Sequence, residues 1–383
     1  MNILKQTLLW ALLACTTISQ TNAETQSPDK RIDPLITVFN VDQAAAMVII
    51  SPNLEAVLID SGRRADQGVR IANYLKDKGI NTLKAVITTH YDADHIKGLP
   101  SLIENGIAVE RVYDQGPSGK RTLLSPTGKQ TVYGKYVIST GDFNGNGVQD
   151  EGESNFIRQK AEYGDTIYLG AEDEVSIRVV SVRGDTRGKS NDLDLDPSKG
   201  NKYFDENPGS IGVTIRHKEF TMYSGGDQTG ASWKDKPRAE ELMLLSGAII
   251  GGNDVDVLNV NHHGSDTSTS SDLANKLKPE VSIISTKFGH DRLPKKTTLK
   301  QLAEAGSVVL ITGDGQDDNG EFAESKSTED DGWDASKYPI HNDQGDIEIS
   351  ITSGEYKVTS TNGFNRTYSF SQCKTPPAYI ALQ

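Results

Sequence analysis

Four side chains with metal-binding chemistry lie within six residues of one another, at His90, Asp92, Asp94 and His95. They follow residues 83–89, an apolar run rich in β-branched side chains that predicts a buried strand. Carboxylates gathered beside a buried strand repel one another and lose their hydration, and a divalent cation offsets both costs. The motif therefore predicts a metal site at the end of a strand. A solvated acidic turn with two incidental histidines is the alternative.

The predicted elements around this motif, and others further along the chain, would place additional metal-binding side chains at strand ends. Residues 96–104 predict a short helix, which puts the motif at a strand-to-helix turn, where α/β sheets bind ligands. Two later predicted strands, residues 220–224 and 256–260, lead to Gly225-Gly226-Asp227 and His262-His263-Gly264-Ser265. The glycines would let the backbone approach an ion or a phosphate closely. The chemistry thus recurs at strand ends.

The motifs together resemble the metallo-β-lactamase-fold hydrolases. Within that family they are similar to the soluble hydrolase domain of the bacterial DNA-uptake competence channel protein and its secreted stand-alone relatives. The resemblance rests on H-x-D-x-D-H at residues 90–95, G-D at 226–227 and H-H-G-S at 262–265, and it extends over residues 35–315. It implies an α/β fold, built as a four-layer αβ/βα metallo-β-lactamase sandwich.

The resemblance also implies a centre of two divalent ions, zinc or manganese. The implied ligands are His90 and Asp92 on one ion, Asp94, His95 and His263 on the other, and Asp227 bridging them. Two ions roughly 3.5 to 4 Å apart activate a water molecule and clamp both oxygens of an in-line displacement, which favours phosphodiester hydrolysis. At position 92 this chain has an aspartate where the wider family has histidine. A carboxylate oxygen is a harder ligand than an imidazole nitrogen, so manganese is expected to compete with zinc more strongly at this site.

Three expected catalytic groups follow from the same resemblance: Asp94, His262 and His290. His262 would face the substrate as a phosphate-binding or acid/base group, and Asp60 would orient the metal loop. His290, with Arg292 two residues further on, could neutralise a phosphate oxygen, or both could instead bond local loop carbonyls.

Two departures from the family pattern bear on the site. Residues 42–46 replace the G-Q-G-D opening of the competence-type branch and lose its carboxylate and glycines. Residues 205–210 stand where the wider family has a middle histidine, although the competence-type branch also has Asn and Ser there. One metal position is therefore expected to be poorly held.

A second ligand-rich stretch, residues 142–153, fits the calcium-loop template D-x-[DN]-x-[DN]-G-x5-E without a mismatch. Its oxygen ligands would be Asp142, Asn144, Asn146, the Val148 carbonyl, Asp150 and Glu153. Residues 131–138 predict a strand before it, so we expect an isolated calcium loop within an insertion and no helix-loop-helix switch. An acidic turn rich in Asn and Gly is the alternative.

The N-terminus predicts export. Residues 1–23 combine a positive start, an apolar core over residues 8–15 and a small-residue cleavage site, and the core is too short to span a bilayer. Processing at Cys15 is the alternative and would leave a lipid-anchored protein at the outer membrane or cell surface. Otherwise the mature chain is expected to be periplasmic or extracellular, and Cys373, its one cysteine, predicts no intramolecular disulfide.

Residues 24–383 are expected to form one hydrolase domain, with an insertion at about 114–205 and β-hairpins at about 340–383. Helical spacing predicts helices over residues 64–76, 238–250, 271–277 and 297–305. A net charge of −13 counts against a protein that binds nucleic acid tightly by phosphate neutralisation, but it does not exclude a nuclease.

Three classes of function fit these residues. The leading one is a secreted, metal-dependent hydrolase of phosphodiester bonds, in nucleic acid or in a phospho-substituted envelope polymer. A lactamase- or lactonase-type acyl hydrolase on the same scaffold is second, although the absent middle histidine and the H-H-G-S step argue against it. The third is a calcium-dependent binding protein with a degenerate active site. The sequence carries no signal for the oligomeric state.

Overall fold

The computed structural model describes most of the chain. The described residues are 32–118, 120–141, 157–170, 174–186, 206–230, 239–240, 255–289, 291–324 and 333–370. Some of the sequence predictions fall elsewhere: the signal peptide at residues 1–23 with Cys15, the calcium loop at residues 142–153, His290 and Cys373 all lie outside the described residues.

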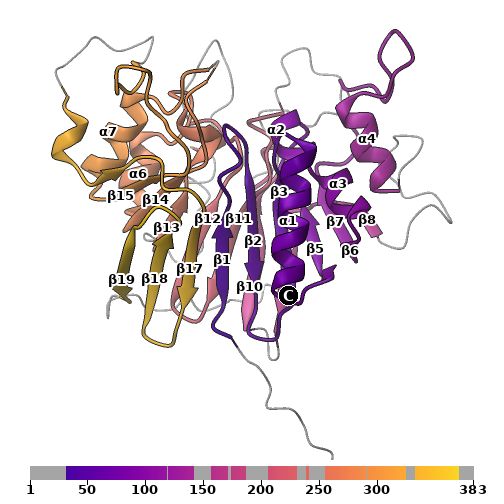
Figure 1. Cartoon of the computed structure of the whole chain (residues 1–383), viewed down its shortest axis with the longest axis horizontal. Helices are drawn as coiled ribbons and strands as arrows, with labels where there is room; N and C mark the ends of the chain where they lie inside the picture. Colours follow the sequence, from indigo (N-terminus) through magenta and orange to yellow (C-terminus); the bar gives the residue numbers. More distant parts are fainter. Residues whose placement is uncertain are drawn as a thin grey trace, which may run out of the picture. The chain divides into compact units, whose positions relative to one another are not determined.

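Two large sheets carry the fold, and the first has nine strands in the order β19-β18-β17-β1-β2-β3-β5-β7-β8 (Figure 1). Its strands are β1 Leu35–Val38, β2 Ala46–Ile50, β3 Ala56–Ser61, β5 Ala85–Ile87, β7 Arg111–Asp114, β8 Ile157–Lys160, β17 Ile347–Ile351, β18 Glu355–Ser360 and β19 Asn365–Ser369. From β19 to β3 neighbouring strands are antiparallel, whereas β3, β5, β7 and β8 run parallel. Within the range expected as C-terminal hairpins, β17, β18 and β19 pair antiparallel with one another in turn.

The second sheet has eight strands in the order β16-β15-β14-β13-β12-β11-β10-β9. Its strands are β9 Thr166–Leu169, β10 Val175–Ser181, β11 Gly212–His217, β12 Phe220–Ser224, β13 Val257–Asn259, β14 Val281–Ile284, β15 Val308–Ile311 and β16 Ile340–His341. From β12 to β16 the strands are parallel. A small separate sheet pairs β4 Thr82–Leu83 with β6 Ala108–Val109.

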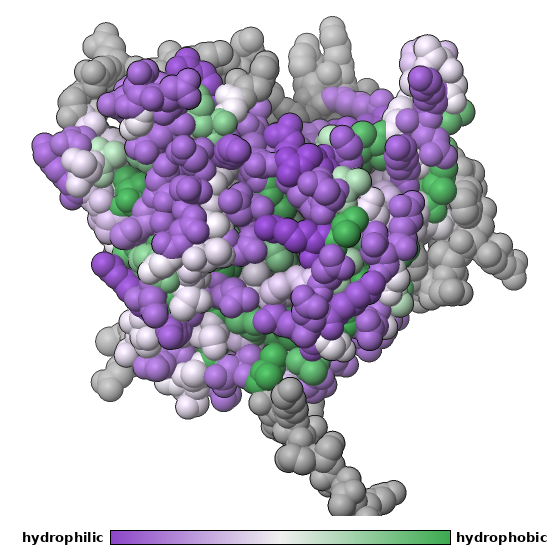
Figure 2. Space-filling model, in the orientation of Figure 1, coloured by the Kyte–Doolittle hydropathy of each residue, from purple (hydrophilic) through white to green (hydrophobic). Residues whose placement is uncertain are grey.

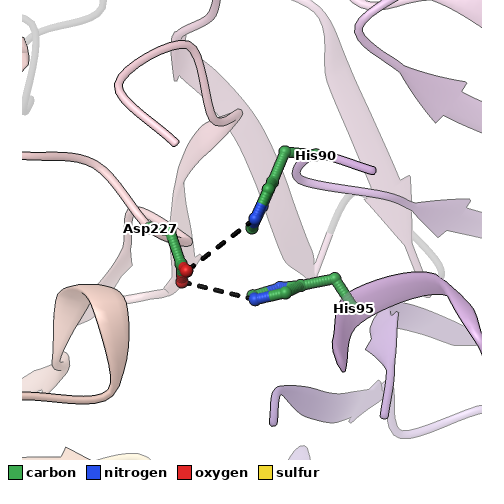
Figure 3. Close-up of side chains that lie close together, drawn as sticks. All are labelled: His90, His95 and Asp227. Carbon is green, nitrogen blue, oxygen red and sulfur yellow. Dashed lines mark ion pairs between the residues drawn. The ribbon is translucent and has the colours of Figure 1, made fainter. Parts of the chain in front are cut away.

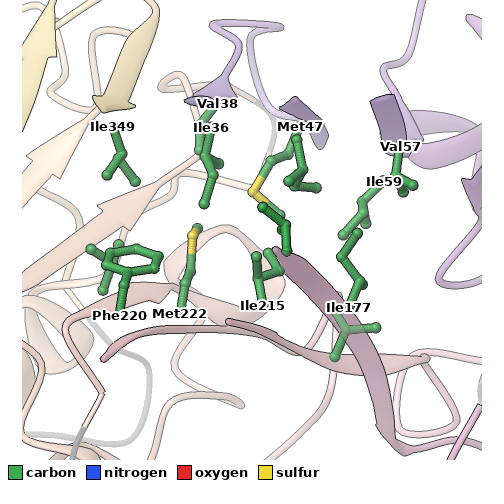
Figure 4. Packing of buried hydrophobic residues seen from close by; sticks show 14 of the residues in the cluster. Ile36, Val38, Met47, Val57, Ile59, Ile177, Ile215, Phe220, Met222 and Ile349 are labelled. Atoms are coloured by element: carbon green, nitrogen blue, oxygen red, sulfur yellow. The ribbon is translucent and has the colours of Figure 1, made fainter. Parts of the chain in front are cut away.

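Alternation along the strands explains why the two large sheets face each other. Ile36 and Val38 of β1 and Met47 of β2 point into the same apolar cluster as Ile215 and Met222 of the second sheet (Figure 4). Successive side chains of a strand point to opposite faces, so residues two apart share this inner layer. The core between the sheets is therefore the central layer of the predicted sandwich.

Helices cover the outer faces. They are α1 Ala65–Asp77, α2 Ala93–Ile96, α3 Leu99–Glu104 and α4 Val132–Ser139 along the first part of the chain, then α6 Ser271–Leu277 and α7 Lys296–Glu304, with short 3-10 turns η3 Asn261–Gly264 and η4 Ala335–Lys337. Apolar residues of α1, α3 and α4 pack with the first sheet, and those of α6 and α7 pack with the second. The four-layer αβ/βα arrangement is thus confirmed, as are the helices expected near residues 64–76, 271–277 and 297–305.

The strand expected over residues 131–138 is wrong, because these residues form α4. Thr131 caps the helix by accepting a hydrogen bond from the Gly134 backbone amide, and Tyr133, Tyr136 and Val137 are buried on one helical face. The β-branched and aromatic side chains that suggested a strand instead fill the outer layer beside the first sheet. The predicted calcium loop therefore follows a helix.

The range expected as an insertion, residues 114–205, supplies strands to both sheets. β8 extends the first sheet beside β7, and β9 and β10 extend the second sheet beside β11. At least these strands are part of the sandwich itself. In the part of the chain that the structure covers, every helix is too short or too polar to cross a bilayer.

The visible surface is mainly hydrophilic, with apolar residues in small separate areas (Figure 2). Of the described large apolar side chains, Leu124 and Tyr168 are the ones that are exposed. The histidine and aspartate side chains that could bind a metal or a substrate instead lie where strands of the two sheets end.

Candidate metal centre

Strand ends from both sheets deliver the candidate ligands. His90 follows β5 of the first sheet by three residues, and α2 then places Asp94 and His95. In the second sheet, Asp227 follows β12 and the two histidines of η3 follow β13. Figure 3 shows His90 and His95 approaching Asp227 from the opposite side. Because carboxyl ends of parallel strands lie at one edge of a sheet, motifs distant in sequence meet here.

Asp227 is the centre of this cluster. Its Oδ1 lies 3.3 Å from His95 Nε2 and 3.7 Å from His263 Nε2. Its Oδ2 lies 3.7 Å from His90 Nε2 and 3.7 Å from His262 Nε2. The two oxygens of one buried carboxylate thus face different imidazoles, which is the geometry expected of a bridging ligand.

The histidine nitrogens test whether these residues fit a cation. The Nε2 atoms of His90, His95 and His263 are buried and have no hydrogen-bond partner among the described residues. Their other ring nitrogens are engaged: His95 Nδ1 lies 2.7 Å from Asp60 Oδ2, and His263 Nδ1 donates to the Ser285 carbonyl at 2.8 Å. Metal-binding histidines are oriented in this way, and a buried polar atom without a partner is costly. The donor set therefore fits a divalent cation.

Two groups of side chains come close enough together to share an ion: His90, His95 and Asp227, and Asp94, His95 and His263. His95 belongs to both groups, although the resemblance implied that it serves one ion only. Asp92 belongs to neither of these groups within the described chain. Its Oδ2 lies 3.4 Å from His90 Nε2, while its Oδ1 contacts the guanidinium of Arg121.

Buried charges shift the pKa values in the cluster. Burial raises the pKa of Asp227, but the imidazoles of His95, His262 and His263 outweigh it and hold that pKa well below its usual range. Against the effect of burial, the imidazole of His263, 3.6 Å away, and that of His95 lower the pKa of Asp94 to about 2. Burial lowers the pKa of His262 below that of an ordinary histidine. The carboxylates are thus charged, and His262 is neutral at neutral pH.

Asp60 holds the metal loop, as its place before the first motif predicts. Its Oδ1 accepts a hydrogen bond from the Thr89 amide at 2.8 Å, and its Oδ2 accepts one from the Thr89 hydroxyl at 2.8 Å. The adjacent Ser61 hydroxyl donates to the His95 carbonyl at 2.9 Å. Asp60 therefore fixes both the backbone before His90 and the ring of His95.

The segment that lacks the middle histidine contributes supporting contacts. Ser210 Oγ lies 3.3 Å from His90 Nδ1 and accepts a hydrogen bond from the Asp227 amide at 3.2 Å. Asn207 Nδ2 lies 3.3 Å from His262 Nε2. Residues 42–46, the other departure, support the metal loop through the backbone, since the Ala45 amide donates to the Asp94 carbonyl at 3.2 Å.

The H-H-G-S turn has an unusual backbone. His262, His263 and Gly264 have φ values of 50°, 54° and 78°, in the left-handed region. A Cβ atom on Gly264 would lie 2.7 Å from Pro294 Cβ, so glycine is required there by space as well. Glu240, which the sequence did not single out, stabilises the turn by accepting a hydrogen bond from Asn261 Nδ2 at 2.8 Å and one from the Ser270 amide at 2.9 Å.

His290 and Arg292 are the pair that the sequence suggested as a contact for a phosphate oxygen. His290 lies outside the described residues, and the guanidinium of Arg292 lies 5.8 Å from the ring centroid of Phe288. Arg121 and Glu206 beside Asp92 are further residues that sequence reasoning missed. A single arginine in an irregular loop carries no periodic signal that could have revealed it.

A family model described as the metallo-beta-lactamase superfamily matches residues 40–287. This range spans more than half of the chain and contains every candidate ligand of the cluster. The chain belongs to the metallo-beta-lactamase superfamily. The competence-type branch within it stays a prediction.

Known proteins similar to this metallo-beta-lactamase superfamily member include one curated protein and several solved structures. Ribonuclease Z from Metallosphaera sedula is 35% identical over 81 residues, which cover 20% of this chain and 26% of that protein. The match thus spans about a quarter of the relative's length. A putative metal-dependent hydrolase from Parabacteroides distasonis has a TM-score of 0.38 and 13% identity, covering 73% of this chain and 93% of that one. A metallo-beta-lactamase with a HARLDQ motif from Cronobacter sakazakii has a TM-score of 0.32 and 14% identity, and the match covers 60% of this chain and 78% of that one.

Membership of the metallo-beta-lactamase superfamily, whose members are metal-dependent hydrolases, supports an enzyme. The fold implies divalent metal binding, and the His/Asp cluster supplies the side chains for it.

Proposed function

We propose that this protein hydrolyses phosphodiester bonds with divalent cations held at the His/Asp cluster. One observation carries the proposal: three buried imidazoles, His90, His95 and His263, turn unpartnered Nε2 atoms toward the carboxylate of Asp227. When bound there, divalent cations supply a more acidic water molecule and polarise a phosphoryl oxygen. The carboxylates of Asp94 and Asp227 among the candidate ligands favour a harder cation than imidazoles alone would, so manganese competes with zinc.

His262 is the proposed acid/base group. It belongs to neither ligand group, its side chain is a quarter exposed, and its Nε2 lies 3.7 Å from Asp227 Oδ2. Thr267 Oγ1 lies 3.2 Å from its Nδ1 and orients the ring. Because burial lowers its pKa, the neutral ring can accept a proton from the attacking water and return it to the leaving oxygen.

The substrate class is argued from charge and from the relatives. The short match to a ribonuclease Z supports a phosphodiester of nucleic acid. The net charge of −13 disfavours tight binding of a long polyanion, which keeps a phospho-substituted envelope polymer as a second candidate substrate.

A three-substrate assay tests the proposal. The metal-free protein is supplied with Mn²⁺ or Zn²⁺ and given bis(p-nitrophenyl) phosphate, nitrocefin or a lactone. We expect turnover of the phosphodiester only, abolished by chelator and restored by metal. Faster turnover of nitrocefin or the lactone would replace the proposal with an acyl hydrolase, and no turnover of any substrate would favour the binding protein.

Export is proposed on the sequence of residues 1–23, which has the form of a signal peptide. The N-terminus of the protein purified from its native cells is expected at Glu24. A lipid-modified N-terminus at Cys15 would instead establish an anchored protein, and an intact Met1 would contradict export.

Calcium binding at residues 142–153 is likewise proposed on the template match. Millimolar Ca²⁺ is expected to raise the melting temperature of the protein, and Glu153→Gln, which replaces the bidentate carboxylate by an uncharged amide with one oxygen, is expected to abolish that increase. An equal increase in the variant would contradict the loop assignment.

A further inference from the structure

Asp92 stands in an ion-pair network that does not belong to either group of candidate ligands. Its Oδ1 contacts Arg121 Nη2, and Arg121 Nε donates to Glu206 Oε2 at 2.6 Å. Asp92 is the residue that departs from the wider family's histidine, and Glu206 lies in the segment where that family has its middle histidine. Asp92 and the segment that lacks the middle histidine therefore meet at a single guanidinium.

The position of Arg121 is held by several contacts. Glu206 is 6% exposed and also accepts a hydrogen bond from the Ser118 hydroxyl at 2.8 Å. The Arg121 backbone amide donates to the same Ser118 oxygen at 3.1 Å. Gln115 Nε2 donates to the Glu206 carbonyl at 3.3 Å, which ties the loop after β7 to this segment. The guanidinium is thus fixed between two carboxylates, and a surface arginine would not be held in this way.

The charge of Asp92 is consequently neutralised beside the position where a first ion would bind. A cation there would have His90, His95 and Asp227 within ligand distance of one another, beside an Asp92 carboxylate that is already paired with a guanidinium. The other position has Asp94, His95 and His263 within ligand distance of one another, with Asp227 Oδ1 beside them and, among the described residues, no ion pair between these carboxylates and an arginine. A nearby positive charge in a partly buried site opposes a divalent cation strongly.

We propose that Arg121 supplies the positive charge beside Asp92 in place of a tightly bound cation. The centre then binds one divalent ion tightly, through Asp94, His95, His263 and Asp227, and a second at least about tenfold more weakly. Glu206 acts by positioning Arg121. The inference rests on the proposed function only in requiring that the cluster binds divalent cations.

Titration of the metal-free full chain with Mn²⁺ tests this without any substrate. Calorimetry and the metal content after gel filtration are expected to show one tightly bound ion per chain. In Arg121→Met, which leaves Asp92 and Glu206 without their cation, the second ion is expected to bind at least about tenfold more tightly. Arg70→Met, which removes an ion pair with Asp346 outside the centre, is the control and is expected to bind Mn²⁺ as the wild type does.

A second pair of variants covers the case in which Arg121→Met does not fold. Asp92→Asn and Asp94→Asn make the same chemical change two residues apart. Asp92→Asn is expected to retain the tight ion, whereas Asp94→Asn is expected to weaken it by about 10- to 100-fold or more.

Three results would overturn the inference: two equally tight ions in the wild type, no gain for the second ion in a folded Arg121→Met, or loss of the tight ion in Asp92→Asn as in Asp94→Asn. Two tight ions in a protein that cleaves the phosphodiester would refute the inference alone. One tight ion in a protein without that activity would refute the proposed function alone.

Discussion

At the scale of single residues, His95 connects the metal cluster to the loop that carries it. Its Nε2 faces Asp227 Oδ1 at 3.3 Å, and its Nδ1 lies 2.7 Å from Asp60 Oδ2. The Asp60 carboxylate accepts its proton and so fixes which nitrogen is available to a cation. Side chains that touch no substrate thus decide how well the centre can bind metal.

Asp60→Asn is the direct test of this role. The carboxylate accepts the Thr89 amide on Oδ1 and both the Thr89 hydroxyl and His95 on Oδ2, whereas the asparagine amide has one acceptor oxygen and its NH2 group would face a donor on the other side. Asparagine tolerates the φ of 54° at this position. Metal affinity or activity is expected to fall by about 10- to 100-fold. Calorimetric titration with Mn²⁺ measures it. A variant that binds as tightly as the wild type would show that Asp60 has no part in orienting His95.

The pKa values predict how metal binding depends on pH. In the metal-free protein, burial alone lowers the pKa of His95 and His263, but Asp227, with Asp60 or Asp94, outweighs it and raises both above 6.5. Below these raised values a cation must displace protons, so Mn²⁺ affinity is expected to fall as the pH falls. Calorimetry at one pH in two buffers of different ionisation enthalpy counts the released protons. Proton release of zero at pH 6.5 would contradict the expectation.

The same shift has a consequence for stability. A histidine whose pKa is raised by folding stabilises the folded state fully below its unfolded pKa and loses that contribution as the pH rises through the folded value. The contribution of His95 and His263 to the metal-free protein is therefore lost above pH 6.5, while metal gains affinity over the same range. A divalent cation and the protons on His95 and His263 thus compete for this cluster.

At the scale of elements, close packing of α1 against the start of α3 positions the metal loop. A Cβ atom on Gly68 of α1 would lie 2.0 Å from the Gly98 carbonyl oxygen, and one on Gly98 would lie 1.9 Å from the Ser61 carbonyl oxygen. Gly98 follows α2 by two residues, so the helix that carries Asp94 and His95 depends on this contact. Two glycines let the backbone segments approach where any side chain would separate them.

Gly68→Ala is expected to lower the free energy of unfolding by about 1–3 kcal/mol, because the added methyl group meets backbone that cannot move aside. Urea unfolding measures the change. Gly354→Ala is the matched control, since a Cβ atom there would have no neighbour within 4 Å, and its effect is expected to stay within about 0.5 kcal/mol. Equal stability of the two variants would mean that α1 can shift without cost.

At the scale of the whole molecule, the centre joins the two sheets of the sandwich. His90, Asp94 and His95 follow the first sheet, and Asp227 and His263 follow the second. A cation that contacts both sets binds only when the sheets are packed together, so metal binding is coupled to folding.

Metal is therefore expected to raise the melting temperature. A cation at 100 times its dissociation constant adds about 2.7 kcal/mol of stability, equivalent to a few degrees for a chain of this size. Differential scanning calorimetry with Mn²⁺ and then with chelator measures the change. Asp94→Asn is expected to lose the increase, and Asp334→Asn, at an exposed carboxylate outside the centre, is expected to keep it. A metal-induced increase of equal size in Asp94→Asn would show that the stabilising ion binds elsewhere.

The amino-acid sequence by itself predicted the strands beside the centre and the chemistry of the side chains that follow them. Alternation and β-branched runs predicted the strands after which His90, Asp227 and His263 lie, because these patterns depend on neighbours within a few residues along the chain. The tertiary structure alone decided two things. The segment 131–138 became a helix because the face that carries Tyr133, Tyr136 and Val137 packs against the first sheet. Arg121 came to pair with Asp92, 29 residues away in sequence, because the segment between β7 and α4 brings its guanidinium to that carboxylate. No local pattern encodes such a contact, since it depends on where the irregular backbone places a single charge.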